Sequence, residues 1–250
     1  IAHRDYKNGV RKLREDLPFP AVLGRVCPRP CQGPCRRQLV DEPITICQLH
    51  RFMGDQTVEE EQTGELLLPV EPKADTGKRI AIVGGGPAGL AAAFYARLEG
   101  HAVKIFEALP KPGGMLRYGI PSYRLPRDLL EKEINVLWRL GVELQVDTRL
   151  GVDVQLEDLL EQYDAVFLAL GAFNSNAMGC PGEDADGVVT AVDFLGELER
   201  TGDVHVGDKV VVIGGGFTAM DACRTSVRKG ASEVTCLYRR SRKEMPAHHT

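Results

Sequence analysis

The chain has 250 residues, of which 43% are hydrophobic and 26% are charged, and its formal net charge at pH 7 is -4. This composition is that of an ordinary globular protein. The net negative charge argues against a nucleic-acid partner, and no apolar run approaches the roughly 20 residues of a membrane-spanning helix. We therefore expect no nucleic acid and no membrane insertion.

The first residues are charged throughout and lack the apolar core of a secretory signal. Seven cysteines are an odd count for a disulfide framework. Both observations predict reduced thiols and a cytoplasmic location.

Residues 1–54 are basic and rich in Pro and Arg, and the stretch GRVCPRPCQGPC within them places Cys27, Cys31 and Cys35 at four-residue steps. This spacing alone leaves three interpretations open: metal ligands, disulfide partners, or small apolar residues of a turn. Residues 55–78 are acidic with little periodicity, and we interpret them as a surface linker in which the run LLLPV packs down.

From Arg79 onward, short apolar strands alternate with helical segments, which is typical of a parallel α/β sheet. The predicted strands are 79–83, 103–106, 165–170, 209–213 and 233–238. The predicted helices lie within 87–100, 126–141 and 217–230, and each of these segments ends in a glycine suited to a left-handed C-cap. The order strand, glycine run, helix and second strand occurs twice, at 79–107 and at 209–240.

The first glycine run, IVGGGPAGL, fits the dinucleotide-binding pattern GxGxxG. Its glycines allow a tight turn, backbone approach to a pyrophosphate, and close helix–strand packing, while the helix N-terminus offers free N–H groups. An acidic residue follows the second strand and can accept hydrogen bonds from ribose hydroxyl groups. The predicted contacts are Gly84, Gly86, Pro87, Ala88, Gly89 and Glu107.

The second run, VIGGGFTAM, fits GxGxxA through Gly214, Gly216 and Ala219. Its second strand ends in YRRSRK, so that Arg239 and Arg240 are expected where the first repeat has its acid. Two guanidinium groups suit a 2′-phosphate. The first repeat then fits FAD or NAD and the second fits NADP. Two other interpretations remain. The arginines could form a solvated basic turn, or the protein could bind a single nucleotide because one of the two loops has lost its function.

The run GGGPAGL, followed by FEALPKPGGMLRYGIPSYRLP, DAVFLALGA, PGEDADGV, VVIGGGFTAMDACRTSVRKGA and YRRSRKEMPA, resembles the glutamate synthase small-subunit family over nearly the whole chain. That family includes the NADPH-oxidising region of dihydropyrimidine dehydrogenase and the flavin subunits of NADP:ferredoxin oxidoreductase and formate dehydrogenase complexes. The resemblance implies an α/β fold with two Rossmann-like dinucleotide-binding domains after a small α-helical iron–sulfur domain.

By this resemblance, residues 1–54 are the iron–sulfur domain, 55–78 a linker, 79–200 the FAD domain and 201–250 part of an NAD(P)H domain. The first and last of these are expected to be incomplete, so that the chain is the middle of a longer subunit. The implied FAD contacts add Gly114, Met115, Arg124 and Leu150, and the implied nicotinamide contacts are Gly214, Gly216, Phe217, Thr218, Ala219, Arg239 and Arg240. Many relatives have Asn or Asp at the position of Phe217, whereas Phe217 places no polar side chain beside the pyrophosphate.

The resemblance also implies [4Fe-4S] clusters, with Cys27 and Cys31 on one cluster and Cys35 on another. His50 falls at the position of a further ligand, and Cys47 is the alternative. The prolines, glycines and arginines around the loop suit thiolate ligands, whereas zinc lacks a second CxxC or a paired His nearby. Cys180, Cys223 and Cys236 are expected to be buried small residues.

These features together predict an electron-transfer flavoprotein subunit of a larger complex, which moves electrons between NADPH (or NADH), FAD and [4Fe-4S] clusters to a partner subunit. No catalytic side chain is expected, because the cofactors carry the chemistry. Met115, Leu116, Tyr118 and Arg124 are candidates beside the flavin ring, or simply packing residues. The alternatives are a non-catalytic scaffold and a thioredoxin-reductase-type enzyme, which would need a CxxC-like pair that the sequence lacks.

Overall fold

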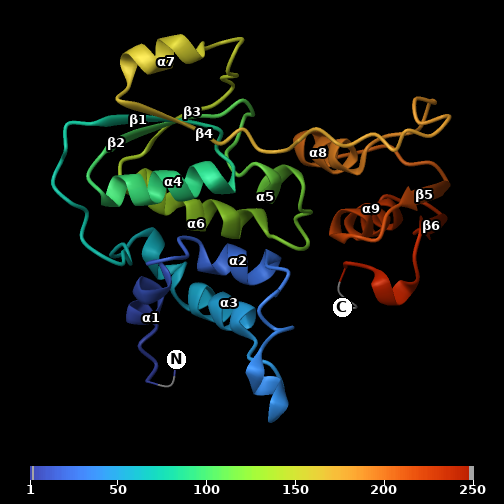
Figure 1. Ribbon diagram of the computed structural model, residues 1–250, viewed down its shortest axis with the longest axis horizontal. Helices are drawn as coiled ribbons and strands as arrows, with labels where there is room; N and C mark the ends of the chain where they lie inside the picture. The colour runs from blue at the N-terminus through green and yellow to red at the C-terminus, as the bar shows by residue number, and fades with distance from the viewer. Residues whose placement is uncertain (2, 248–250) are drawn as a thin grey trace. The chain divides into compact units, whose positions relative to one another are not determined.

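The computed structural model describes residues 1 and 3–247, and the chain forms two compact units. The first unit comprises residues 1–114 and 124–171, and the second comprises residues 115–123 and the chain from 172 onward. Each unit contains a parallel sheet (Figure 1). The α/β class is confirmed, while the domain boundaries expected from the sequence stay predictions.

A four-stranded parallel sheet with the strand order β3-β2-β1-β4 forms the centre of the first unit. In the register, Val83 pairs with Phe106 on one side and with Leu168 on the other, so the carboxyl ends of three strands share one edge. The strands are β1 (Arg79–Val83), β2 (Ala102–Phe106), β3 (Glu143–Gln145) and β4 (Ala165–Leu168).

Helices cover both faces of this sheet. Figure 1 shows α7 on one face and α4 with α6 on the other, and α6 packs in turn against α2 of an N-terminal helical layer. This layer confirms the α-helical domain expected at the N-terminus. The helices are α1 (Tyr6–Leu13), α2 (Pro20–Val26), α3 (Ile46–Thr57), α4 (Pro87–Leu98), α6 (Arg127–Arg139) and α7 (Leu156–Gln162), with the 3-10 turns η1 (Arg36–Leu39) and η2 (Glu60–Gln62).

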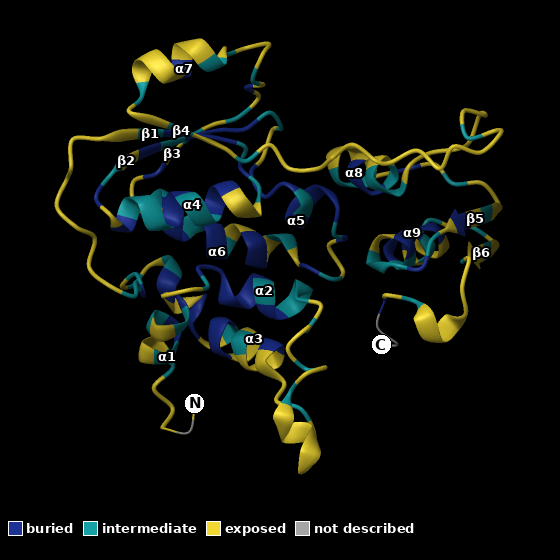
Figure 2. Ribbon diagram, in the orientation of Figure 1, coloured by how far each residue is buried: buried dark blue, intermediate teal, exposed yellow. Residues whose placement is uncertain are grey.

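The second unit is built on a two-stranded parallel sheet that α9 covers on one face. Val210, Val212 and Val234 pack toward α9, whereas the alternate residues of β5 and every residue of β6 except Val234 are exposed (Figure 2). Its elements are β5 (Lys209–Ile213), α9 (Phe217–Arg228) and β6 (Glu233–Leu237), and the unit also contains α5 (Met115–Tyr118), α8 (Ala191–Thr201) and η3 (Arg242–Glu244).

The three predicted glycine C-caps are confirmed. Gly100, Gly141 and Gly230 follow α4, α6 and α9 within two residues of each helix end, and their φ angles are 87°, 82° and 100°. These values lie in the left-handed region that residues with a Cβ rarely adopt. Each helix therefore stops where the sequence predicts, and the chain turns directly into the next strand.

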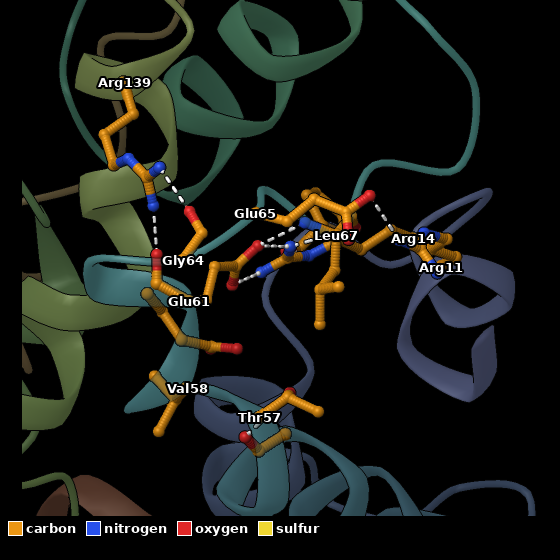
Figure 3. Close-up of polar contacts among 12 residues, drawn as sticks. Arg11, Arg14, Thr57, Val58, Glu61, Gly64, Glu65, Leu67 and Arg139 are labelled. Carbon is orange, nitrogen blue, oxygen red and sulfur yellow. Dashed lines mark hydrogen bonds and ion pairs between the residues drawn. The ribbon is translucent and has the colours of Figure 1, made fainter. Parts of the chain in front are cut away.

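A buried ion pair fixes the segment between the helical layer and the sheet (Figure 3). The guanidinium group of Arg14 donates to both carboxylate oxygens of Glu61, and both side chains are almost fully buried. Glu61 also accepts the backbone N–H of Leu67 at 2.8 Å, while Arg139 of α6 donates to the Glu61 and Gly64 carbonyls. The predicted linker thus packs down at Leu67, as expected, but is also anchored through a buried charge.

Within residues 1 and 3–247, no helix combines the length and the apolar character needed to cross a lipid bilayer.

Candidate functional site

The first glycine loop joins β1 to α4, and two of its positions, Gly84 and Gly89, require glycine. Gly84 has φ 108° and donates its N–H to the Phe106 carbonyl at 2.8 Å. A Cβ built on Gly89 would lie 1.9 Å from the Gly84 oxygen, so α4 approaches β1 only because this residue is glycine. A Cβ on Gly86 would meet only the Gly114 Cα, at 3.7 Å. The space in front of the α4 N-terminus therefore stays open.

Glu107 lies buried beside this loop. Its carboxylate accepts the N–H of Gly85 at 2.6 Å and that of Leu109 at 2.8 Å. Its own carbonyl accepts the N–H of Thr148 at 2.9 Å, which brings the segment leading to Leu150 alongside. Because a carboxylate has about four lone-pair positions, two remain for ribose hydroxyl groups. The loop and its acid thus fit an adenine dinucleotide.

Other predicted flavin contacts divide between the two units. Gly113 donates its N–H to the Gly85 carbonyl at 2.7 Å, which places Gly114 against the loop. Leu150 packs against the cluster that includes Val83 and Phe106 at the carboxyl edge of the sheet. Arg124 is half-buried in the segment before α6. Met115, Leu116 and Tyr118 lie in α5 of the second unit. Their roles stay predictions.

The second loop repeats this arrangement with a different residue beside the glycines. Gly214 has φ 138° and donates to the Leu237 carbonyl at 2.9 Å, as Gly84 does to Phe106. This equivalence places Tyr238 where the first repeat has Glu107. The expectation that Arg239 and Arg240 occupy that position is therefore wrong by one and two residues.

Tyr238 packs its ring over the second loop, since a Cβ on Gly215 would lie 2.7 Å from it. Arg239 and Arg240 follow as exposed residues just beyond the end of β6. Nothing lies within 4 Å of a Cβ built on Gly216, and Phe217 and Thr218 form the first turn of α9. Ala219 is buried against Val212 in the helix–sheet interface. The N-terminus of α9 therefore has room for phosphate groups.

The cysteine loop follows α2 directly. The N–H of Arg29 donates to the sulfur of Cys27 at 3.4 Å, and Arg29 has φ 59°, an uncommon conformation for a residue with a side chain. Backbone N–H groups of Ile44 and Arg37 lower the pKa of Cys35. Cys31 is exposed in the same loop. The backbone contacts of Cys35 favour its thiolate, the form that binds iron.

In the part of the chain that the structure describes, no group of three or more His, Cys, Asp or Glu side chains converges on one metal ion. A [4Fe-4S] cluster takes one thiolate on each iron, so its ligands need not converge on a point. Cys27 and Cys31 fit part of the ligand set of one such cluster, and Cys35 fits part of the set of another. Burial lowers the pKa of His50, which favours the neutral form of its imidazole. Cys47 is buried and donates its thiol to the Gly24 carbonyl at 3.1 Å, and burial raises its pKa. A protonated thiol suits a ligand less well.

The remaining cysteines differ from the expectation of buried residues. Cys180 and Cys236 are exposed, and Cys223 is half-buried. Cys180 lies in a loop without regular structure, and Cys236 lies on β6, whose described sheet has only two strands.

Glu133, a fully buried carboxylate on α6, was not predicted from the sequence. It accepts the N–H groups of Ala21 and Val22 at 2.8 and 2.6 Å, and so holds the start of α2, the helix whose C-cap is Cys27. The signal was present: Glu133 falls three and four residues from apolar positions, on the buried face of its helix. Glu133 thereby connects the cysteine loop to the helix that backs the first sheet.

Glu133→Gln should remove a pH dependence of stability. Burial raises the pKa of Glu133 to about 7, against the opposing effect of two backbone N–H groups and of Arg14; nearby Glu61 adds to the rise. The folded state therefore binds the proton more tightly than the unfolded chain, and stability falls as pH rises from the ordinary carboxyl pKa toward 7. Urea unfolding from about pH 5 to 8 should show this slope in the native chain but not in Glu133→Gln. An equal flattening in Glu157→Gln, which changes an exposed carboxyl on α7, would contradict this assignment.

Comparisons with known proteins agree with both parts of this geometry. The family model of pyridine nucleotide-disulphide oxidoreductases matches residues 78–249, and the model described as dihydropyrimidine dehydrogenase domain II, 4Fe-4S cluster, matches residues 1–62.

Curated relatives include the NADPH-Fe(3+) oxidoreductase subunit beta of Geobacter sulfurreducens, 48% identical over 94% of this chain and 35% of the relative. The glutamate synthase [NADPH] small chain of Escherichia coli is 40% identical over 91% of this chain and 50% of the relative. The chain thus spans between about a third and half of these relatives. Mycobacterium tuberculosis FprA in complex with NADPH matches 68% of this chain and 45% of its own, with a TM-score of 0.58 and 28% identity.

Proposed function

Because the chain belongs to the pyridine nucleotide-disulphide oxidoreductase family, we propose that it is an electron-transfer flavoprotein part of a larger oxidoreductase complex. In this proposal it takes electrons from NADPH, or NADH, to FAD and [4Fe-4S] clusters and on to a partner subunit. Relatives named as a beta subunit and a small chain support this view.

The observation that carries the proposal is a pair of open glycine loops, each followed by a different kind of polar residue. Both loops leave space at the second glycine and at a helix N-terminus, where a pyrophosphate can accept N–H groups. The first loop is followed by a buried acid suited to ribose hydroxyls, and the second by two exposed arginines suited to a 2′-phosphate. We therefore assign FAD to the first loop and NADPH to the second.

Bound flavin and clusters would supply the hydride and single-electron chemistry. The chain's own residues position these groups: Gly86 lets backbone approach the flavin pyrophosphate, and Glu107 orients the ribose. Cys27, Cys31 and Cys35 would bind iron, with His50 as a candidate further ligand. No side chain needs to move a proton in this scheme.

A cytoplasmic location is part of the same proposal. It is supported by seven free cysteines in the structure, since such thiols persist in a reducing compartment. The partner would be an electron-donating or electron-accepting subunit.

Replacing Arg239 and Arg240 by Ala should weaken NADPH binding selectively. Each lost guanidinium removes charge-assisted hydrogen bonds of about 1.5–3 kcal/mol, so the Kd for NADPH should rise at least tenfold while that for NADH stays within about twofold. Anaerobic titration, followed by bleaching of the flavin band, measures both. The matched control changes Arg242 and Lys243 to Ala, which removes the same charge from the adjoining turn. If the affinities for NADPH and NADH fall to a similar extent, the arginines contribute only general electrostatic attraction and do not bind the 2′-phosphate.

The visible spectrum separates the proposal from its rivals. Flavin peaks with a broad cluster shoulder indicate an electron carrier, whereas a colourless protein indicates a scaffold. A thioredoxin-reductase-type enzyme would need a redox pair with CxxC-like spacing, and none of the seven cysteines lies three residues from another.

A further inference from the structure

Two cysteines of the second unit face the same helix–sheet interface. On β6, Val234 and Cys236 are two residues apart and so project to the same side, where Val234 packs toward α9. Cys223 of α9 packs into the cluster formed by Val212 and its neighbours, and Val212 pairs with Cys236 in the sheet register. The two thiols thus approach each other from a helix and a strand.

One of the two thiols is hydrogen-bonded to the second glycine loop. Cys236 donates its thiol to the Gly214 carbonyl at 3.2 Å. Cys223 lies on α9, which packs against β6. Burial, and then the neighbouring Cys236, raise the pKa of Cys223 to about 11. Gly214 is the first glycine of the loop, so Cys236 connects this pair of cysteines to the turn of the loop.

The two sulfurs differ in access. Cys236 is exposed, whereas Cys223 is half-buried under α9. A reagent in solution therefore reaches Cys236 first, and Cys223 lies where it can react with a mixed disulfide formed on Cys236. Small residues of α9, Ala219 and Ala222, pack in the same interface and let the helix approach the strand closely, as a disulfide requires.

We propose that Cys223 and Cys236 form a redox-active pair, which a low-molecular-weight disulfide closes into an intramolecular disulfide. The sulfur of Cys236 attacks one sulfur of the reagent and releases the first small thiol. Cys223 then attacks the Cys236 sulfur, breaks the mixed disulfide and releases the second small thiol. The two protein thiols lose two electrons and two protons, and the reagent is reduced to two thiols.

Closure changes the loop, because the Gly214 carbonyl loses its thiol donor and α9 becomes tied to β6. On the function proposed above, on which this consequence rests, the closed form binds the nicotinamide nucleotide more weakly. We expect the affinity to fall about tenfold, which is the effect of losing one typical hydrogen bond that helps to order the loop.

The test treats the complete protein anaerobically with oxidised glutathione and maps its tryptic peptides. The expected product joins peptide 210–224, which contains Cys223, to peptide 230–239, which contains Cys236. Cys223→Ser should instead retain one glutathione on Cys236. Cys180→Ser, which removes an exposed cysteine elsewhere in the unit, should leave the 223–236 linkage unchanged. Amide exchange of residues 214–219 should differ between the closed and the reduced forms.

A stable glutathione adduct on Cys236 of the native chain, or a linkage to another cysteine, overturns the pair. Unchanged amide exchange in the loop overturns the coupling to Gly214. Nucleotide binding is measured separately on the reduced protein. If the reduced protein binds no nicotinamide nucleotide, the proposed function fails, while the peptide map and the exchange data still decide the inference.

Discussion

Arg14→Met is expected to lower the free energy of unfolding by about 3–5 kcal/mol, because it leaves the Glu61 carboxylate buried without its cation. The side chains of Arg14 and Glu61 are only 2% and 4% exposed. Arg14 also donates to the carbonyls of Pro18 and Leu67, each at 3.1 Å, so its loss opens the junction between α1 and the 60–67 segment.

Urea unfolding measures the effect, and Arg11→Met is the matched control, because Arg11 lies in the last turn of α1 and Arg14 is its C-cap. Arg11 pairs with Glu65 (Figure 3). The Glu65 side chain is 66% exposed, so this variant should lose at most about 1 kcal/mol. Adding Glu61→Leu to Arg14→Met should recover most of the loss, since a well-packed apolar replacement of a buried pair is often neutral. Equal losses for Arg14→Met and Arg11→Met would show that burial does not set the strength of these pairs.

Gly89→Ala should abolish flavin binding and also destabilise the first unit. Its Cβ would lie 1.9 Å from the Gly84 oxygen and 3.1 Å from Ile82, and neither a backbone carbonyl nor a buried strand residue can move aside cheaply. Separating α4 from β1 should cost about 1–3 kcal/mol. It should also lower the flavin content of the purified protein at least tenfold.

Gly86→Ala provides the contrast that separates packing from ligand contact. Its Cβ meets only an ordinary contact 3.7 Å away, so unfolding of the flavin-free protein should change by no more than about 0.5 kcal/mol. Flavin content should nevertheless fall as strongly as in Gly89→Ala, because the methyl group takes the place of the pyrophosphate. Flavin absorbance per chain and urea unfolding measure the two effects. Full flavin content in Gly86→Ala would remove this loop from the binding site.

Most of the parallel sheet could be predicted from the sequence, because its strands are short apolar runs next to glycine turns. β1 and β5 begin and end where expected, and β2 and β6 differ by one residue. The very short β3 and the amphipathic α7 and α8 were not predicted. β3 has only three residues, so its conformation depends on pairing with β2 rather than on its own pattern.

The residues that position the site fall into those that local sequence determines and those that tertiary packing determines. The glycines act within a few residues of their own position, so their motif reveals them. Glu133 and Glu61, which were not predicted, are buried by elements more than forty residues away, and a charged residue is ordinarily expected on the surface. The error that placed Arg239 and Arg240 at the position of Tyr238 is also one of tertiary structure, because the pairing of β6 with β5 and the hydrogen bond from Gly214 to Leu237 define that position.

The exposed face of the β5–β6 ribbon has a consequence for how these 250 residues, prepared alone, respond to heating. Val211, Ile213 and Leu237 are each more than half exposed there, and a sheet of two strands is marginal without further support. In a protein made of these 250 residues alone, the second unit should therefore unfold at a lower temperature than the first. Its apolar strands would then pair with those of neighbouring molecules, so thermal unfolding should depend on protein concentration and should not reverse on cooling.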